Sequence, residues 1–421
     1  MTIVETDSAN AGERLRDAWL AFAGIVLVAA NLRLAVSSLG PVLDEVRGGL
    51  RLSGSVAGVV TTLPLICFAV FGALTPRLAS RYGVHRVLVV AGIALALGLV
   101  TRAVCSSAVV FVVASTLALV GLALQNVLLP VLVKRHFPGH IGIVTGCYAT
   151  VMVAGASFAA AITVPITHAW GGWRMGLGIW ALAVPLQLLP WLRLAWADRP
   201  MHSAAHKAVH SAAHTQPNPI RPARTRLGWV FAIYFGTQGI HTYVVLSWLP
   251  QWFRDSGFSA ETAGALVAVA VILGIPMALA MPVIAERCTD QRGFVLAFAA
   301  CYCAGYIILG LAPRAGAWPA TILLGLGGGT FPLLLTMLGL RARTTAGTAA
   351  LSGFVQSTGY LIAALGMLVV GLLHDTTLRW QEVVIFLMAT VMLQTGAGLS
   401  AGRPQYLEDE RKEPRGYADA R

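Results

Sequence analysis

Long apolar runs recur along this chain about every 35 residues, and they constrain its fold more than any other feature. Each run can cross the hydrocarbon core of a bilayer as a helix, which takes about 20 residues. Only 11% of the residues are charged and 57% are hydrophobic, whereas soluble domains usually carry about 25% charged residues. The sequence therefore predicts an all-α membrane protein with twelve transmembrane helices, at 18–42, 54–76, 86–104, 108–133, 141–166, 174–193, 228–253, 261–284, 293–312, 317–340, 345–373 and 380–401.

An internal repeat divides these spans into two pseudo-symmetric halves of six. The segment Pro76–Arg86 after the second span matches Pro282–Arg292 after the eighth in its Pro, its Ala and both its Arg. Ser53 and Ser259 hold equivalent places in the repeat and are predicted N-caps. The predicted domains are an N-terminal tail at 1–17, an N-terminal half at 18–193, a linker at 194–227, a C-terminal half at 228–401 and a C-terminal tail at 402–421.

The basic residues predict how the chain is oriented in the membrane. The net charge of +12 would suggest a nucleic-acid partner in a soluble protein, but most of these residues lie between apolar runs, so we expect no nucleic acid. About twice as many Lys and Arg lie in the connections on one side of the spans as on the other. We therefore predict a multi-pass protein of the inner (plasma) membrane, with both termini and the linker in the cytoplasm.

Arg33 is the charged residue that lies deepest in the first predicted span, Ala18–Val42. A guanidinium at that depth costs at least a few kcal/mol unless a partner solvates it. No Asp or Glu lies deep in any predicted span, so an ion pair within the protein is not expected. We interpret Arg33, with Asn31, as the floor of a polar cavity that accepts an anionic or strongly dipolar substrate. The alternatives are a side chain that snorkels to the interface and a structural hydrogen bond.

Other polar residues at membrane depth are candidates for the same substrate site. They are Gln125 and Asn126 in the fourth span, Tyr148 in the fifth, Gln238 and His241 in the seventh, and Gln356 and Tyr360 in the eleventh. Amides and phenols hold a small polar solute without a metal or cofactor, and we expect neither here. The alternative for each is a hydrogen bond between helices. His241 is either a proton relay, which leaves a proton as an open partner, or a packed neutral imidazole.

Two further motifs have a structural and a functional interpretation. His202, His206, His210 and His214 in the linker follow at four-residue spacing, which suits a shared metal ion on a helix but also simple low-complexity repetition. The glycines of Gly325–Gly329 lack the Lys-Ser/Thr of a phosphate loop, so we expect them to allow close helix approach or bending. Gly142 and Gly146 form a small-xxx-small packing face.

Taken together, several of these segments make the chain resemble the cyanate and 2-nitroimidazole transporter group of the major facilitator superfamily. The resemblance covers nearly all of residues 20–400. The residues that carry it are Asn31-Leu32-Arg33 with Gly40-Pro41, Gln125–Phe137, Tyr234–Gly236 with Ser247–Pro250, Gly325–Leu333 and Gln356–Gly359.

The superfamily's loop motif, which the resemblance links to gating, follows the second span and is repeated after the eighth. Its usual form has Gly, then Asp-Arg-x-Gly, then basic residues. Ser80 replaces the acid in the first copy, so the charge-relay latch of the motif is not expected there. The matching positions are Gly72, Arg81, Gly83 and Arg86 in the first copy, with an acid–Arg pair at Glu286 and Arg287 in the second.

The resemblance and the composition together predict a secondary transporter rather than an enzyme. Its substrate would be a small anionic or polar solute, similar to cyanate or to 2-nitroimidazole, moved across the inner membrane by alternating access. The main alternative is a drug or metabolite exporter of the same fold. A membrane-embedded enzyme or receptor would need a catalytic constellation or a sizeable soluble module, and the sequence contains neither.

Overall fold

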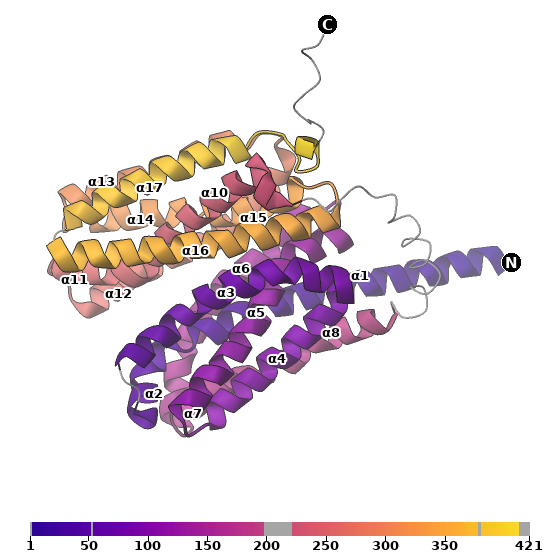
Figure 1. Cartoon of the computed structure of the whole chain (residues 1–421), viewed down its shortest axis with the longest axis horizontal. Coiled ribbons are helices and arrows are strands. Elements are labelled where there is room, and N and C mark those ends of the chain that lie inside the picture. Colours follow the sequence, from indigo (N-terminus) through magenta and orange to yellow (C-terminus); the bar gives the residue numbers. More distant parts are fainter. Residues whose placement is uncertain (1, 52–53, 198–220, 378–379, 412–421) are drawn as a thin grey trace, which may run out of the picture. The chain divides into compact units, whose positions relative to one another are not determined.

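The computed structural model describes residues 2–51, 54–197, 221–377 and 380–411, and all regular elements in these ranges are helices (Figure 1). Each long helix coincides with an apolar run of the sequence. The first part of the chain contains α1 (Thr2–Ser37), α2 (Leu43–Leu50), α3 (Gly54–Tyr82), α4 (Val84–Val104), α5 (Ala108–His136), α6 (Ile141–Ala169), α7 (Trp173–Gly178) and α8 (Ala183–Ala197). The second part contains α10 (Arg226–Tyr243), α11 (Leu249–Asp255), α12 (Ala260–Arg287), α13 (Arg292–Leu311), α14 (Ala317–Gly327), α15 (Thr330–Leu340), α16 (Thr345–Thr377) and α17 (Trp380–Ala401).

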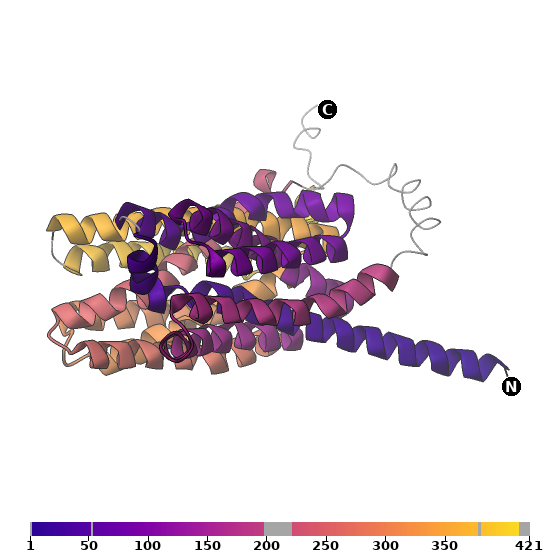
Figure 2. The same ribbon diagram turned by 90° about the horizontal axis from the view of Figure 1, so that it is seen from below.

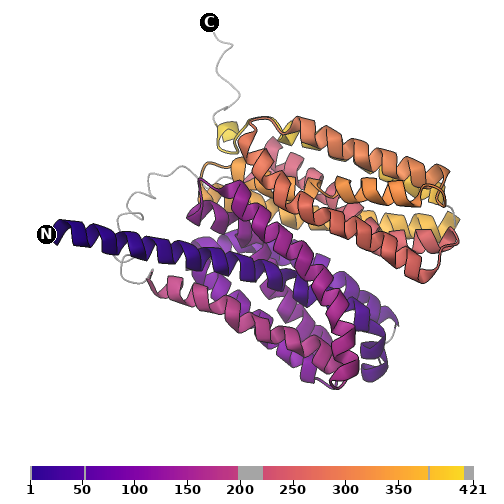
Figure 3. The ribbon, with the colours of Figure 1, turned by 180° about the vertical axis from the view of Figure 1, so that it is seen from behind.

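The described residues confirm the predicted all-helical membrane fold. Eleven helical segments in them are long and apolar enough to cross a bilayer. The remaining predicted span, the seventh, is made of α10 and α11 joined without a break by a π turn at Val244–Trp248. The helix of the first span starts at Thr2 rather than at Ala18, and α1 is a single unbroken ribbon in Figure 3.

Contacts between Cα atoms group the chain into two compact units. Unit 1 comprises Met1–His140 and Cys147–Pro219, and unit 2 comprises Ile141–Gly146 and Ile220–Arg421. In unit 1, α5 packs along α4, α3 and α1, and α8 packs against α1 and α4 (Figure 2). In unit 2, α10 packs against α16 and α17, and α13 packs against α14 and α17.

Small residues bring α4 and α5 into backbone contact in unit 1. A Cβ atom added to Gly121 of α5 would lie 2.4 Å from the carbonyl oxygen of Ala91 in α4. One added to Gly98 of α4 would lie 2.5 Å from the backbone nitrogen of Ala118 in α5. Both distances are far below a van der Waals contact, so only glycine fits at these two positions. Close backbone approach of this kind replaces the hydrophobic driving force that is absent between helices in lipid.

The glycine motifs predicted to allow close packing do so in unit 2. A Cβ atom on Gly325 would lie 2.8 Å from the carbonyl oxygen of Ala270 in α12, and Gly327 packs against the ring of Tyr302. The helix also breaks here, between α14 and α15. At Gly142 and Gly146, added Cβ atoms would lie 2.4 and 2.7 Å from carbonyl oxygens of α12.

One of the two predicted N-caps lies within the described residues and is confirmed. The hydroxyl of Ser259 accepts a hydrogen bond from the backbone N–H of Thr262 at 3.2 Å, at the start of α12. Ser53 lies outside the described residues.

Candidate functional site

Arg33 and Asn31 lie near the end of α1, and the structure gives them different surroundings. Arg33 is half-buried and lies one turn before the helix ends at Ser37, with its Cβ beside Gly155 of α6. Asn31 is buried, and its Nδ2 donates to the carbonyl oxygens of Leu27 at 3.1 Å and of Ala183 at 3.3 Å. Asn31 thus ties α1 to the start of α8, while Arg33 lies on the side of α1 that meets α6.

Gln125 of α5 is a fully buried amide. Its exposed fraction is 0%, and neither its Nε2 nor its Oε1 has a hydrogen-bond partner among the residues that the structure describes. A buried polar group left without a partner costs about 1–3 kcal/mol. Asn126 follows it at an intermediate exposure, and Tyr148 of α6 is buried in the same unit. Both polar atoms of the Gln125 amide can therefore form a hydrogen bond with a solute or a water.

Gln238, Gln356 and Tyr360 lie on two packed helices of unit 2. Nε2 of Gln238 donates to the Thr242 hydroxyl at 2.8 Å, and Nε2 of Gln356 donates to the Ser352 hydroxyl at 2.7 Å, each one turn away on its own helix. The ring of Tyr360 on α16 lies edge-on to Phe235 of α10, with centroids 5.1 Å apart. Gln356 and Tyr360 are four residues apart on α16, so they lie on the same face of that helix.

His241 faces α13 instead. Its Nδ1 lies 3.0 Å from the hydroxyl of Tyr306, and its ring stacks on Tyr302 with centroids 4.7 Å apart. Nε2 of His241 has no partner among the described residues, and the side chain is fully buried. This imidazole contacts two phenols, which favours a packed hydrogen-bonding residue over a proton relay.

Arg102 of α4 is a further charged residue at this end of α1, and it was not among the predicted site residues. It is only 4% exposed, and its Nη2 donates to the carbonyl oxygen of Ala35 at 3.3 Å and to the hydroxyl of Ser38 at 3.5 Å. These acceptors lie where α1 ends and its last carbonyls lack helical partners. The guanidinium therefore caps the same end of α1 that carries Arg33. Its place in the last turn of α4 was the available signal.

The two copies of the loop motif behave differently. In the first copy Gly72 is buried, Arg81 and Arg86 are exposed, and Gly83 has a φ of +88° that suits glycine at the N-cap of α4. The Ser80 hydroxyl donates a hydrogen bond within its own helix, to the Arg77 carbonyl oxygen at 2.9 Å.

In the second copy, the Glu286 carboxylate accepts a hydrogen bond from the backbone N–H of Gly142 at 2.7 Å, at the start of α6. Arg287, beside it, is exposed. Anions are favoured at a helix N-terminus. The acid retained in this copy therefore binds the start of α6, whereas the serine of the first copy bonds within its own helix.

The same loop contains an exposed ion pair that makes unfolding depend on pH. Arg292 donates to both carboxylate oxygens of Asp290, and this hydrogen bonding lowers the pKa of Asp290 to about 2. An unfolded Asp has a pKa of about 3.9, so the stabilisation is fully present above about pH 4 and is lost as the pH falls toward 2. We expect Asp290→Asn to flatten the pH dependence of the melting temperature between pH 5 and 2 in detergent. An unchanged pH profile in this variant would contradict the assignment.

Metal ligands do not gather in the part of the chain that the structure describes. In those residues no group of three His, Cys, Asp or Glu side chains could share an ion. The linker histidines His202, His206, His210 and His214 lie outside the described residues.

Comparison with known proteins places this architecture in a family. The family model for the Major Facilitator Superfamily matches residues 25–367. The chain is 33% identical to the 2-nitroimidazole transporter of Escherichia coli K12 over 90% of this chain and 95% of that protein. It is 26% identical to the cyanate transport protein CynX of the same organism, over 83% of this chain and 89% of that protein.

A solved structure of the proton:xylose symporter XylE shares the fold, with a TM-score of 0.71 and 15% identity over 96% of this chain and 99% of that chain. The predicted resemblance to the cyanate and 2-nitroimidazole transporter group is thereby confirmed. The twelve-helix fold, the family model and the length of the matches agree: the chain belongs to the Major Facilitator Superfamily of secondary transporters.

Proposed function

We propose that this protein moves a small anion or a small polar heterocycle, similar to cyanate or to 2-nitroimidazole, across the inner membrane by alternating access. Both termini would lie in the cytoplasm, following the excess of Lys and Arg in that set of connections. The names of two relatives support the substrate class, because one is a 2-nitroimidazole transporter and the other transports cyanate.

The proposal rests on a guanidinium at membrane depth, in a chain whose predicted spans contain no deep Asp or Glu. Arg33 lies within the membrane-crossing part of α1, and no Asp or Glu occurs deep in any predicted span. A cation at such a place attracts an anion or the negative end of a dipole, such as a nitro group. The substrate is therefore proposed to bring a negative charge or the negative end of a dipole to this guanidinium.

We assign the neighbouring polar residues to binding and orientation. In unit 1 the unpartnered amide of Gln125 would hydrogen-bond the solute, with Asn31, Asn126 and Tyr148 around it. In unit 2 the corresponding contributions would come from the residues Gln238, His241, Gln356 and Tyr360. Asn31, Gln238, His241 and Gln356 also form hydrogen bonds within their own units, so they would position helices as well as contact the solute. Proton coupling stays open, and co-transport of a proton on the substrate needs no intramembrane carboxylate.

Uptake into proteoliposomes tests the substrate class. We expect saturable uptake of labelled cyanate or 2-nitroimidazole by the purified protein, with each compound competing against the other. Empty liposomes and liposomes with the Arg33→Ala variant are the controls, since both retain simple diffusion of a neutral heterocycle. Uptake that does not saturate, or that neither compound inhibits, would contradict the proposal.

A further inference from the structure

The chain does not leave unit 2 when its last membrane helix ends. After α17, residues 402–410 form hydrogen bonds at the start of α10, at the end of α15 and just before α16. This segment is the yellow ribbon beyond α17 in Figure 1. Leu407 is fully buried there, and its backbone N–H donates to the carbonyl oxygen of Arg341 at 2.9 Å. A segment predicted to be a polar tail thus contributes a core residue and a backbone hydrogen bond.

The carboxylate of Glu410 caps the start of α10. Its Oε2 accepts a hydrogen bond from the backbone N–H of Arg226 at 2.7 Å, and its Oε1 accepts one from Leu227 at 2.9 Å. These N–H groups belong to the first turn of α10, which has no helical acceptors for them. A carboxylate also lies favourably at the positive end of the helix dipole.

The carboxylate of Glu408 binds the two residues that immediately precede α16, one of which, Thr344, caps the first turn of that helix through its hydroxyl. It accepts hydrogen bonds from the backbone N–H of Arg343 at 2.9 Å and of Thr344 at 3.1 Å, and from the Thr344 hydroxyl at 3.2 Å. Burial opposes ionisation of Glu408, but these hydrogen bonds outweigh it and lower the pKa of the carboxyl. The carboxylate is accordingly charged throughout the neutral range.

Tyr406 and Asp409 of the same segment both contact Arg343. Arg343 forms an ion pair with Asp409, with Nη1 and Oδ1 2.8 Å apart, and its guanidinium lies over the ring of Tyr406 at 4.6 Å. Two parallel hydrogen bonds between guanidinium and carboxylate fix orientation as well as distance.

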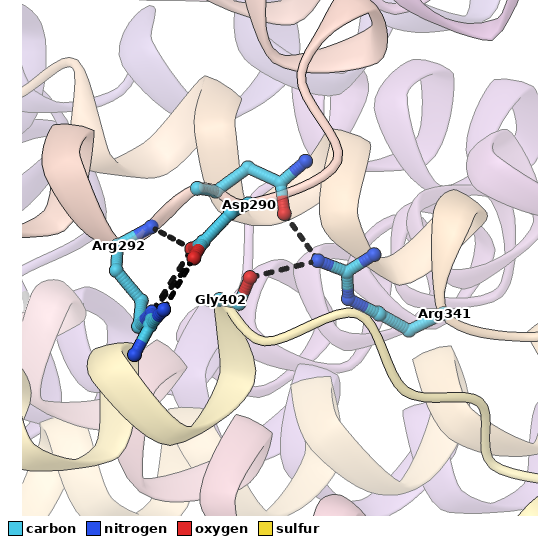
Figure 4. A network of polar contacts seen from close by, with 5 residues as sticks. Asp290, Arg292, Arg341 and Gly402 are labelled. Carbon is cyan, nitrogen blue, oxygen red and sulfur yellow. Dashed lines mark hydrogen bonds and ion pairs between the residues drawn. The ribbon is translucent and has the colours of Figure 1, made fainter.

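Arg341 joins the base of this segment to the start of α13 (Figure 4). Its Nη2 donates to the side-chain oxygen of Gln291 and, at 3.0 Å, to the carbonyl oxygen of Gly402. The amide of Gln291 in turn donates to the carbonyl oxygens of Ala285 and Cys288 at the end of α12. Arg341 is buried, so these acceptors replace the water that its guanidinium has lost.

We propose that Gly402–Glu410 is a clasp, a conformational device that makes the starts of α10 and α16 and the end of α17 move as one body. Each carboxylate ties one helix start to the same short segment, and Arg341 anchors that segment to the connection between α12 and α13. In a secondary transporter, the helices of one unit must stay together while access changes sides. Opening the clasp would loosen this end of unit 2 and slow that change.

The clasp makes a prediction that two independent helix caps do not make. Removing Glu410 should release the segment that also carries Glu408, so Glu410→Ala should speed amide hydrogen exchange at the start of α16 as well as α10. Glu408→Ala should show the reciprocal effect. We expect exchange about tenfold faster or more in the peptides that contain Arg226 and Leu227 and those that contain Arg343 and Thr344.

Hydrogen exchange of the full-length protein in detergent or nanodiscs measures this directly, without any assumption about the substrate. Glu382→Gln, an exposed acid in the first turn of α17, is the matched control and should leave both peptides unchanged. A chain that ends at Arg411 keeps both glutamates and should behave like the full chain. The milder pair Glu408→Gln and Glu410→Gln covers the case in which an alanine variant does not fold.

Two outcomes would overturn the clasp. Unchanged exchange at both helix starts in Glu408→Ala and in Glu410→Ala would show that the glutamates are not structural. An effect of each substitution confined to its own helix would leave two separate caps and no common device. Because neither readout uses a substrate, failure of the clasp would be distinct from failure of the proposed transport function.

Discussion

Arg33→Ala is expected to abolish saturable uptake and the substrate-dependent rise in melting temperature, while the protein still folds. Arg33 is half-buried near the end of α1, so its loss removes little packing. The loss at the substrate is larger, because a hydrogen bond to a charged group contributes about 1.5–3 kcal/mol. At about 1.4 kcal/mol per tenfold, that weakens binding by roughly 10- to 100-fold.

The charge and the shape of the side chain are separable at this position. Arg33→Lys retains the charge but offers a point donor rather than a planar fork, so we expect partial recovery of uptake with weaker apparent affinity. Arg16→Ala is the matched control, since Arg16 is an exposed arginine of the same helix and its loss changes the net charge equally. Thermal-shift titration with cyanate or 2-nitroimidazole gives the measurement. An unaltered ligand response in Arg33→Ala would remove Arg33 from the site.

Gly121→Val is expected to have the largest effect on stability of any single substitution considered for unit 1. Even the first added carbon would lie 2.4 Å from the Ala91 carbonyl oxygen and 3.0 Å from the Leu95 nitrogen. Both are backbone atoms of α4, so relief requires α4 and α5 to separate along their contact. Overpacking of a tight interior typically costs about 1–3 kcal/mol and occasionally more.

Thermal unfolding in detergent, followed with the yield of monodisperse protein, measures this effect. We expect a lowered melting temperature for Gly121→Ala and little folded protein for Gly121→Val. Gly264→Ala is the control, because an added Cβ on this glycine of α12 meets nothing within 4 Å. That control should be neutral or slightly stabilising, as Ala in a helix interior is favoured over Gly by about 0.5–1 kcal/mol. A normal melting temperature for Gly121→Val would show that α4 and α5 are not in backbone contact.

The membrane helices could be predicted from the sequence because their cause is local. A run of about 20 apolar residues must satisfy its backbone internally in lipid, so hydropathy alone locates it. The Ser259 cap and the packing glycines also have local causes. Residue type and spacing alone predict an N-cap at Ser259 and close helix packing at Gly142, Gly146 and Gly325. The number of apolar runs and the internal repeat then indicated twelve helices in two halves of six.

The features that escaped prediction depend on partners distant in the sequence. Arg102 lies near the end of a predicted span, and nothing in the nearby sequence indicates a partner. The fold brings the Ala35 carbonyl oxygen at the end of α1 to its guanidinium. The acids of 402–410 belong to the predicted C-terminal tail, because nothing local indicates that backbone N–H groups of Arg226 and Arg343 donate to them. The π turn at Val244–Trp248 was missed because hydropathy does not distinguish a π turn from an α turn.

That π turn has a consequence for how the seventh helix is compared with its relatives. A π turn accommodates one residue more than an α turn, so side chains after Trp248 are rotated by about 100° from where an unbroken helical wheel would draw them. A relative that lacks one residue between Val244 and Trp248 can form an ordinary α-helix there. A single-residue gap at this point of a sequence alignment therefore indicates that the relative lacks the π turn, and it is not an alignment error.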